Sequence, residues 1–544
     1  MREVDVICVG SGLGGVTAAL ATHESGGEAI LLEKAPKLGG VCAYSGGEVF
    51  VPCNHLMARA GTPDDPVQAK AYLDFLAGGY ADPALAEVLF REGPRVAQWV
   101  EETCGVQWQL IDDFADYHYP KAPGTVATGR YLEPALFEGA TLGPWQKKSY
   151  TTPHMPPGIS HEELFAWGGL PRIMEWDFAT MGQRIAKDIR GMGPAMMGWF
   201  LKAAVVDRGI EARVGTAVTR LIREEGRVVG VEVSGESGRE VIRARRGVVL
   251  AIGGYDWNPE MAKHFEGLPE WNSMVQPSVE GDNIVLGGEL GAALAGVPSY
   301  NLGMFMGYQV PGEQHEGKPL WRASWEGGYP HAIWVNQAGK RFADEAFYRA
   351  YLPRCHDWDG EAQGHPNYPP YLIFDQNYRD KYGFCSYLPG QPVPETLLAR
   401  ADTLEELATQ LGIDGDGLVQ TVARFNPMAE AGVDEDFARG TYPWAARMTG
   451  DDRRPNPNLG PLNKAPFYGI RLSAVGVGIN AVGLKTDVHG RVMHVRGQPI
   501  DGLYAAGNTA ALLDIGAGYQ SGLSNLRGMV WGYLSAMHAM GSGG

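Results

Sequence analysis

The clearest pattern of apolar and polar positions lies at the start of the chain. Residues 4–9, VDVICV, form a mostly apolar run that predicts a buried strand, and VTAALATHES from Val16 predicts a helix. A second apolar run, EAILLEK, predicts another strand that ends at Glu33. A strand, a glycine-rich turn, a helix and a second strand in this order predict an α/β domain with a parallel sheet.

Further along the chain the same patterns recur. Residues 210–233 predict short strands separated by turns, and residues 247–258, GVVLAIGGYDWN, predict a buried strand that runs into Gly253-Gly254. Leucines at helical spacing in TLEELATQLGI, residues 403–413, predict a surface helix. After Asn525 the apolar positions again have helical spacing, which predicts a C-terminal helix with Ser524 as its N-cap.

The first turn carries the residues that bind a dinucleotide. It reads Gly10-Ser11-Gly12-Leu13-Gly14-Gly15, and Glu33 follows 23 residues after Gly10. In this strand–turn–helix context, glycines let the backbone approach a pyrophosphate at the N-terminus of the helix. The acid at the end of the second strand is expected to accept hydrogen bonds from ribose hydroxyls, and its charge disfavours a 2′-phosphate.

A second glycine-rich loop suits a cofactor that extends past the pyrophosphate. It follows Glu33 directly, and its candidate contacts are Lys34, Gly39, Gly40, Ser45, Gly46 and Gly47. At this point the sequence resembles the fumarate reductase/succinate dehydrogenase-type flavoproteins, which include the 3-ketosteroid dehydrogenases. The resemblance implies FAD in a Rossmann-like α/β domain with an inserted α+β capping domain. Some members carry a histidine here that bonds to the flavin. Because residues 34–47 contain no histidine, we expect non-covalent FAD.

The resemblance implies further cofactor contacts in later segments. Val218 occupies the place where the family's backbone meets adenine, and Gly281-Asp282-Asn283 resembles the family's GDG element. The expected contacts are Val218, Ala251, Gly253, Gly254, Asp282, Gly507, Asn508, Ser524, Asn525 and Leu526. In this family the start of the last helix faces the flavin pyrimidine ring, so its positive dipole would favour flavin reduction.

The same resemblance divides the chain into domains. The expected FAD-binding domain consists of residues 1–283 and 466–544, and the capping, substrate-binding domain of residues 284–465. The stretch from Asn336 to Glu345 resembles the family's VNxxGxRFxxE signature. Residues 90–200 are rich in Trp, Tyr and Met, and either a substrate pocket or plain core packing would explain them.

The candidate catalytic residues centre on GAGYQSGLSN, residues 516–525. In the ketosteroid dehydrogenases, a tyrosine in such a segment and a nearby backbone amide bind the substrate ketone. Tyr519 and the amide of Gly522 would form this pair here, and would stabilise the enolate that forms when an α-proton is removed. Tyr348 stands where the family places its catalytic base, and Tyr119 or Tyr117 could assist it.

Ser521 leaves the position of the new double bond open. The 1,2-dehydrogenating branch of the family reads YPGAG at this place, whereas Tyr519, Ser521 and Gly522 form a YxSG arrangement. That arrangement resembles the 4,5-dehydrogenating branch, in which a serine two residues after the tyrosine takes part.

The expected function is an FAD-dependent dehydrogenase that introduces a C=C bond next to a ring ketone. A 3-ketosteroid is the first expected substrate, and a smaller cyclohexanone-type ketone is the second. One alternative is a fumarate- or enoate-type reductase, but the position of its catalytic arginine holds Gly328. A shifted loop could still bring Arg322 to that place. An electron-transfer flavoprotein subunit is the other alternative. The electron acceptor is unidentified.

Composition narrows the partners. A formal net charge of −17 disfavours nucleic acid. Without a CxxC pair a metal site is not expected, and no run of 18 apolar residues predicts a membrane span. Six scattered cysteines in a long chain fit a reducing compartment, so we expect a cytoplasmic protein.

Overall fold

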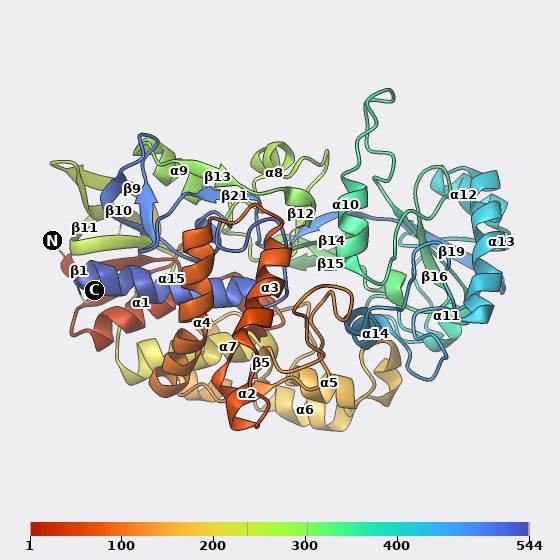
Figure 1. The fold of residues 1–544 in the computed structure, drawn as a ribbon, viewed down its shortest axis with the longest axis horizontal. Coiled ribbons are helices and arrows are strands. Elements are labelled where there is room, and N and C mark those ends of the chain that lie inside the picture. Colours follow the sequence, from red (N-terminus) through yellow and green to blue (C-terminus); the bar gives the residue numbers. More distant parts are fainter. Residues whose placement is uncertain (1, 237, 302, 542–544) are drawn as a thin grey trace.

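The computed structural model describes residues 2–236, 238–301 and 303–541. Figure 1 shows two lobes along the long axis of the molecule. One end holds the larger sheet with helices α1 (Leu13–Glu24) and α15 (Leu523–Met540). The other end holds helices α12 (Leu404–Leu411) and α13 (Gly415–Ala431). The chain ends and begins in the first lobe, so the second lobe is an insertion between its two parts.

The larger sheet has eight strands, and its centre is parallel. The order runs β22-β23-β11-β1-β2-β8, with β10 on β11 and β9 on β10. Their bounds are β1 Arg2–Val9, β2 Ala29–Leu32, β8 Glu211–Arg213, β9 Ala217–Glu224, β10 Arg227–Gly235, β11 Gly238–Leu250, β22 Arg491–Met493 and β23 Pro499–Ala505. The strands predicted at 4–9, before Glu33 and within 210–233 are confirmed. The strand predicted from 247 is longer: it begins at Gly238 and ends at Leu250, so Gly253-Gly254 lies in the following loop.

Helices α1 and α15 pack together beside this sheet through glycines. A Cβ atom on Gly532 would lie 2.3 Å from the carbonyl oxygen of Gly14. A side chain there would force the helices apart. The predicted helix at 16–25 is confirmed, although α1 begins three residues earlier at Leu13, directly after the glycine turn. The predicted C-terminal helix is also confirmed as α15.

Residues 49–201 form a layer of helices and short strands under the first lobe (Figure 1). The helices are α2 His55–Arg59, α3 Pro66–Ala77, α4 Pro83–Cys104, α5 His161–Ala166, α6 Phe178–Ala186 and α7 Met192–Leu201. The strands are β3 Val49–Phe50, β4 Trp108–Leu110, β5 Tyr131–Pro134, β6 Phe137–Glu138 and β7 Ile189–Arg190. This region supplies both core and cavity wall: Phe200 is fully buried in the core, whereas Phe114 and Tyr117 face the cavity described below.

The capping lobe has its own four-stranded sheet, β16-β17-β19-β18, and core. Its strands are β16 Ala332–Val335, β17 Tyr371–Asp375, β18 Ala399–Ala401 and β19 Phe467–Arg471, and its helices include α10 Tyr348–Cys355, α11 Gln376–Lys381 and α14 Pro443–Thr449 besides α12 and α13. The surface helix predicted at 403–413 is confirmed as α12. The capping domain is expected to end at residue 465, but β19 pairs with β17 and β18, so the sheet of this lobe continues to Arg471.

A second four-stranded sheet, β12-β20-β14-β15, joins the lobes. It combines β12 Asn272–Ser273 and β20 Ser473–Gly476 with β14 Met304–His315 and β15 Lys318–Ala323. The elements between are α8 Pro259–Glu266, α9 Asp282–Glu289, β13 Leu294–Gly296 and β21 Val482–Leu484. Across the described ranges, no helix is long and apolar enough to cross a membrane.

Candidate active site

The glycines of the turn after β1 have two roles: two of them allow close packing, and one leaves open space. Gly10 has a φ of +93°, and a Cβ on it would lie 2.2 Å from the carbonyl oxygen of Ala251. A Cβ on Gly15 would lie 1.8 Å from the carbonyl oxygen of Gly10. In contrast, a Cβ on Gly12 would meet only the Cα of Gly40, 4.0 Å away. Gly12 therefore faces the open cavity, as a glycine that lets backbone approach a pyrophosphate must.

Glu33 is buried at the end of β2 and lines the same cavity. Ser11 donates to one carboxylate oxygen from its backbone N–H at 2.9 Å and from its hydroxyl at 2.6 Å, and Ala35 N–H donates to the other at 2.8 Å. Burial raises the pKa of Glu33, and these hydrogen bonds offset only part of that effect. The oxygen that accepts only from Ala35 retains acceptor capacity for a ribose hydroxyl.

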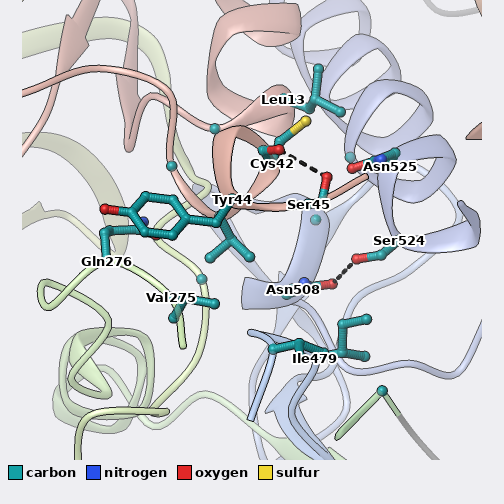
Figure 2. Close-up of a pocket in the computed structure, with 18 of the residues that line it drawn as sticks. Leu13, Cys42, Tyr44, Ser45, Val275, Gln276, Ile479, Asn508, Ser524 and Asn525 are labelled. Carbon is teal, nitrogen blue, oxygen red and sulfur yellow. Dashed lines mark hydrogen bonds between the residues drawn. The ribbon is translucent and has the colours of Figure 1, made fainter. Parts of the chain in front are cut away.

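The start of α15 differs from the sequence prediction. Ser524 is not the N-cap: Gly522 holds that position with a φ of +86°, and a Cβ there would lie 2.4 Å from the backbone N of Phe50. The Ser524 hydroxyl instead donates to Asn508 Oδ1 at 2.9 Å, as Figure 2 shows. Asn525 Nδ2 donates to the carbonyl oxygen of Glu48 at 2.8 Å. The helix N-terminus thus lines the cavity with its polar side chains tied to neighbouring loops.

The cavity brings together most of the predicted cofactor contacts from distant parts of the chain. It is lined by Gly10, Gly12, Leu13, Gly14, Glu33, Lys34, Gly40, Ser45, Gly46, Val218, Ala251, Gly253, Asp282, Gly507, Asn508, Ser524 and Asn525. Its lining does not include Gly15, Gly39, Gly47, Gly254 and Leu526. Close packing explains several of these: a Cβ on Gly254 would lie 2.0 Å from Asn480 Oδ1, and one on Gly47 would lie 2.4 Å from Met192 C.

The other end of the cavity is built around three buried tyrosines, Tyr117, Tyr348 and Tyr519. The hydroxyls of Tyr117 and Tyr348 share a hydrogen bond. Burial raises the pKa of Tyr348 to about 12, although the nearby Arg349 guanidinium lowers it. Burial also raises the pKa of Tyr519 well above its usual value, and the backbone amide of Gly522 partly offsets this as a hydrogen-bond partner.

The structure distinguishes between the two candidate tyrosines, Tyr119 and Tyr117. Tyr119 is only half-buried and is not among the residues that line the cavity, whereas Tyr117 lines it beside Tyr348. Sequence reasoning could not choose between them, because both precede the same proline in ADYHYP and only the path of this loop decides.

Two charged residues at the tyrosine end were missed from the sequence. Glu48 lies beside Ser521, whose hydroxyl donates to its carboxylate, and His161 Nε2 lies 3.8 Å from the other carboxylate oxygen of Glu48. Both residues line the cavity. A lone glutamate after two glycines and a lone histidine at the start of a helix carry no signal of this proximity.

The tyrosine end is otherwise aromatic and aliphatic. Its lining includes Phe114, Met155, Leu164, Phe305, Trp325, Trp444 and Met448. Within the described residues, no arginine lines the cavity. Arg322 pairs with Glu313 at 2.6 Å, and Gly328 occupies a buried turn. The chamber can donate two hydrogen bonds to a carbonyl oxygen. The Arg349 guanidinium stacks on the Tyr348 ring, 4.1 Å from its centroid, outside the described lining.

Comparisons with known proteins agree with this geometry. The model of the family described as FAD binding domain matches residues 5–524. The chain is 35% identical to a 3-oxosteroid 1-dehydrogenase of Mycobacterium tuberculosis, over 99% of this chain and 98% of that protein. It is 34% identical to a 4-oxocyclohexanecarboxylate 2-dehydrogenase of Sinomonas cyclohexanicum, over 98% of this chain and 92% of that protein.

Among solved structures, the chain is similar to a 3-ketosteroid delta1-dehydrogenase from Sterolibacterium denitrificans in complex with 1,4-androstadiene-3,17-dione. The TM-score is 0.89 at 29% identity, and the match covers 100% of both chains. The two folds therefore agree across both lobes.

Proposed function

Because this chain belongs to the FAD binding domain family of flavoproteins, we propose that it is an FAD-dependent dehydrogenase that desaturates a 3-ketosteroid next to its carbonyl. The observation that carries the proposal is the cluster of Tyr117, Tyr348 and Tyr519 with the Gly522 amide in an aromatic chamber. The relatives named as 3-oxosteroid 1-dehydrogenase and 3-ketosteroid delta1-dehydrogenase support the substrate class.

The residues at the dinucleotide end fit FAD. Gly12 leaves space for close backbone approach, and Glu33 retains acceptor capacity. We expect the cofactor to be held without a covalent bond, since residues 34–47 contain no histidine. When bound, FAD supplies the two-electron acceptor for the β-hydrogen of the substrate, which leaves as hydride.

At the other end, Tyr519 and the Gly522 amide would donate to the ketone oxygen. As the α-proton leaves, negative charge develops on that oxygen, and two fixed donors stabilise it. Tyr348 would take the α-proton, with Tyr117 as its hydrogen-bond partner. The aromatic walls would exclude water and hold a flat ring system.

The position of the bond is proposed as C1–C2. The relative at 35% identity is named as a 3-oxosteroid 1-dehydrogenase, and the solved structure at 29% identity as a 3-ketosteroid delta1-dehydrogenase. The YxSG arrangement had suggested the 4,5 branch, but the Ser521 hydroxyl is engaged with Glu48. The relative that acts on 4-oxocyclohexanecarboxylate makes a small ketone the second candidate. A carboxylate on the substrate would lack an arginine partner in the described lining.

The test is anaerobic mixing of the purified yellow protein with 4-androstene-3,17-dione, with 4-oxocyclohexanecarboxylate and with succinate. We expect the steroid to bleach the flavin and to yield 1,4-androstadiene-3,17-dione. Bleaching by the small keto acid alone would transfer the proposal to the second substrate. If no ketone bleaches the flavin, but fumarate reoxidises the dithionite-reduced protein, the chain is a reductase.

All six cysteines are unpaired, which supports a cytoplasmic site of action.

A further inference from the structure

A buried acid lies next to the tyrosine cluster without a role in the steps above. Glu48 immediately precedes β3, and its side chain is 13% exposed. One carboxylate oxygen accepts from the Ser521 hydroxyl, whereas the other is buried without a hydrogen-bond partner. Glu33 and Asp282 are the other carboxylates in the described lining, and they lie at the dinucleotide end. Glu48 is therefore the carboxylate that serves the tyrosine end.

Two hydroxyl pairs lie between Tyr348 and this acid. Tyr348 and Tyr117 share a hydrogen bond, and Ser521 donates to Glu48. The pairs are held side by side, because the backbone N–H of Tyr117 donates at 3.2 Å to Oε1 of Gln520, the residue before Ser521. Burial raises the pKa of Tyr117, and nearby Ser521 lowers it. The four residues of the two pairs line the cavity. Each hydroxyl on the path can accept one proton and release another.

His161 supplies positive charge beside Glu48. Its Nδ1 lies 3.1 Å from Glu133, a fully buried carboxylate on β5, and its Nε2 lies 3.8 Å from Glu48. Burial lowers the pKa of His161, but the hydrogen bond and charge of Glu133, with the charge of Glu48, more than offset this and leave the pKa raised. A histidine cation between two carboxylates offsets the charge that Glu48 would otherwise bring into an apolar chamber.

The tyrosine pair needs such an acceptor. With a pKa of about 12, Tyr348 is a neutral phenol at neutral pH. It can take the α-proton only if its own proton leaves at the same time. Tyr117 is buried as well, and burial raises its pKa well above the usual value. The two phenols alone therefore cannot hold the proton that leaves the substrate.

We propose that Glu48 is the proton acceptor of the dehydrogenation, reached from Tyr348 through Tyr117 and Ser521, with His161 and Glu133 as positioning residues. This inference rests on the proposed function. The α C–H bond breaks and its proton forms a new O–H bond on Tyr348. The Tyr348 proton moves to Tyr117, that of Tyr117 to Ser521, and that of Ser521 to Glu48, which becomes a carboxylic acid. The electron pair left on the α-carbon forms the C=C bond as hydride leaves the β-carbon for FAD.

The titratable groups around Glu48 come from several elements. His161 belongs to α5, Tyr348 to α10, and both Tyr131 and Glu133 to β5. The groups that face Glu48 directly or through His161 are Cys42, Tyr131, Glu133, His161, Glu162, Tyr348 and Tyr519. When protonated, His161 is the cation of this set, and its charge stabilises the Glu48 carboxylate that accepts the proton.

The test compares Glu48→Gln with the wild type in the anaerobic reaction with 4-androstene-3,17-dione. Glutamine keeps the shape and can accept from Ser521, but it cannot accept a proton. We expect flavin bleaching to slow by about 100-fold, the usual value of a general base, with unchanged substrate Kd. The wild-type rate should fall in D2O, and Glu48→Gln should lose this dependence. Glu48→Asp should recover part of the rate.

Glu138→Gln is the matched control, because it removes the same charge from an exposed position on β6, on a side chain that does not line the cavity. Its bleaching rate should stay within about threefold of wild type. A wild-type rate in Glu48→Gln would overturn the relay while leaving the proposed function intact. Equal slowing in both variants would also overturn it. If the wild type is bleached by no ketone, the proposed function and the relay both fail.

Discussion

The two ends of the cavity are assembled from the chain in different ways. At the dinucleotide end, Gly10, Gly12 and Glu33 come from one β1–α1–β2 unit, and their spacing alone identifies the chemistry. At the tyrosine end, Tyr117 and Tyr348 meet although 231 residues separate them. A site built from one local unit can be recognised in the sequence as a motif. A site formed between two lobes consists of residues that lie far apart in the sequence.

The two ends also treat a buried carboxylate differently. The oxygens of Glu33 accept from Ser11 and Ala35, so the protein supplies partners for both. Glu48 has one oxygen without a hydrogen-bond partner and a histidine 3.8 Å away. The first arrangement holds a fixed acceptor for a ligand, and the second leaves a carboxylate oxygen that can form a new bond. Substitutions at the dinucleotide end should therefore change cofactor binding, and substitutions at the tyrosine end should change turnover.

The largest expected effect belongs to Tyr519→Phe at the tyrosine end. Removing one of two donors to a developing oxyanion should lower kcat by about 10²–10³-fold. FAD content should stay at the wild-type level, because the dinucleotide end is untouched. Turnover with the steroid and the flavin absorbance of the purified protein measure the two effects. A variant with near-normal turnover would contradict the role of Tyr519 as an oxyanion donor.

Gly12→Val tests the dinucleotide end in the opposite sense. Since a Cβ on Gly12 meets no atom closer than 4.0 Å, the protein should fold. The side chain would occupy the space of the pyrophosphate, and such overpacking costs about 3 kcal/mol, or about 100-fold in Kd for FAD. Flavin titration of the apoprotein measures the loss, and its melting temperature is the control. Tight FAD binding by a folded Gly12→Val protein would show that the cofactor does not pass this glycine.

Glu33→Gln should weaken FAD binding and stabilise the apoprotein. Loss of a charged hydrogen-bond acceptor costs about 1.5–3 kcal/mol, or about 10–100-fold in Kd. Because burial raises the pKa of Glu33, the folded protein binds this proton more tightly than the unfolded chain does. The linked stability is full below the unfolded pKa and is lost as pH rises through the folded pKa.

At pH 7 the apoprotein of Glu33→Gln should therefore melt higher than the wild-type apoprotein, and the difference should shrink towards acid pH. Melting curves at several pH values measure it. A variant that melts lower than wild type at pH 7 would mean that the hydrogen bonds of Glu33 outweigh its burial.

The sequence predicted the first lobe well because its signals are local. Strand periodicity and glycine spacing located β1, α1 and β2 to within a few residues. The tyrosine end was predicted only as a resemblance, which named Tyr348 and Tyr519 but not Glu48 or His161. Their proximity depends on how the loop before β3 meets α5, and no periodic pattern encodes such a contact. The same limit explains Ser524, whose residue type favours an N-cap although the backbone places Gly522 there.

The smallest expected effect concerns this helix start. Since Ser524 does not cap α15, Ser524→Ala should lose only its hydrogen bond to Asn508, worth about 1 kcal/mol or less. Ser160 does cap α5, and its hydroxyl and Glu163 form a full capping box beside His161. Ser160→Ala should therefore cost up to about 2 kcal/mol. Chemical unfolding of both variants measures the difference. A larger loss of unfolding free energy in Ser524→Ala than in Ser160→Ala would mean that the start of α15 depends on this serine. Both ends of the cavity would then rely on a serine to hold the start of a helix.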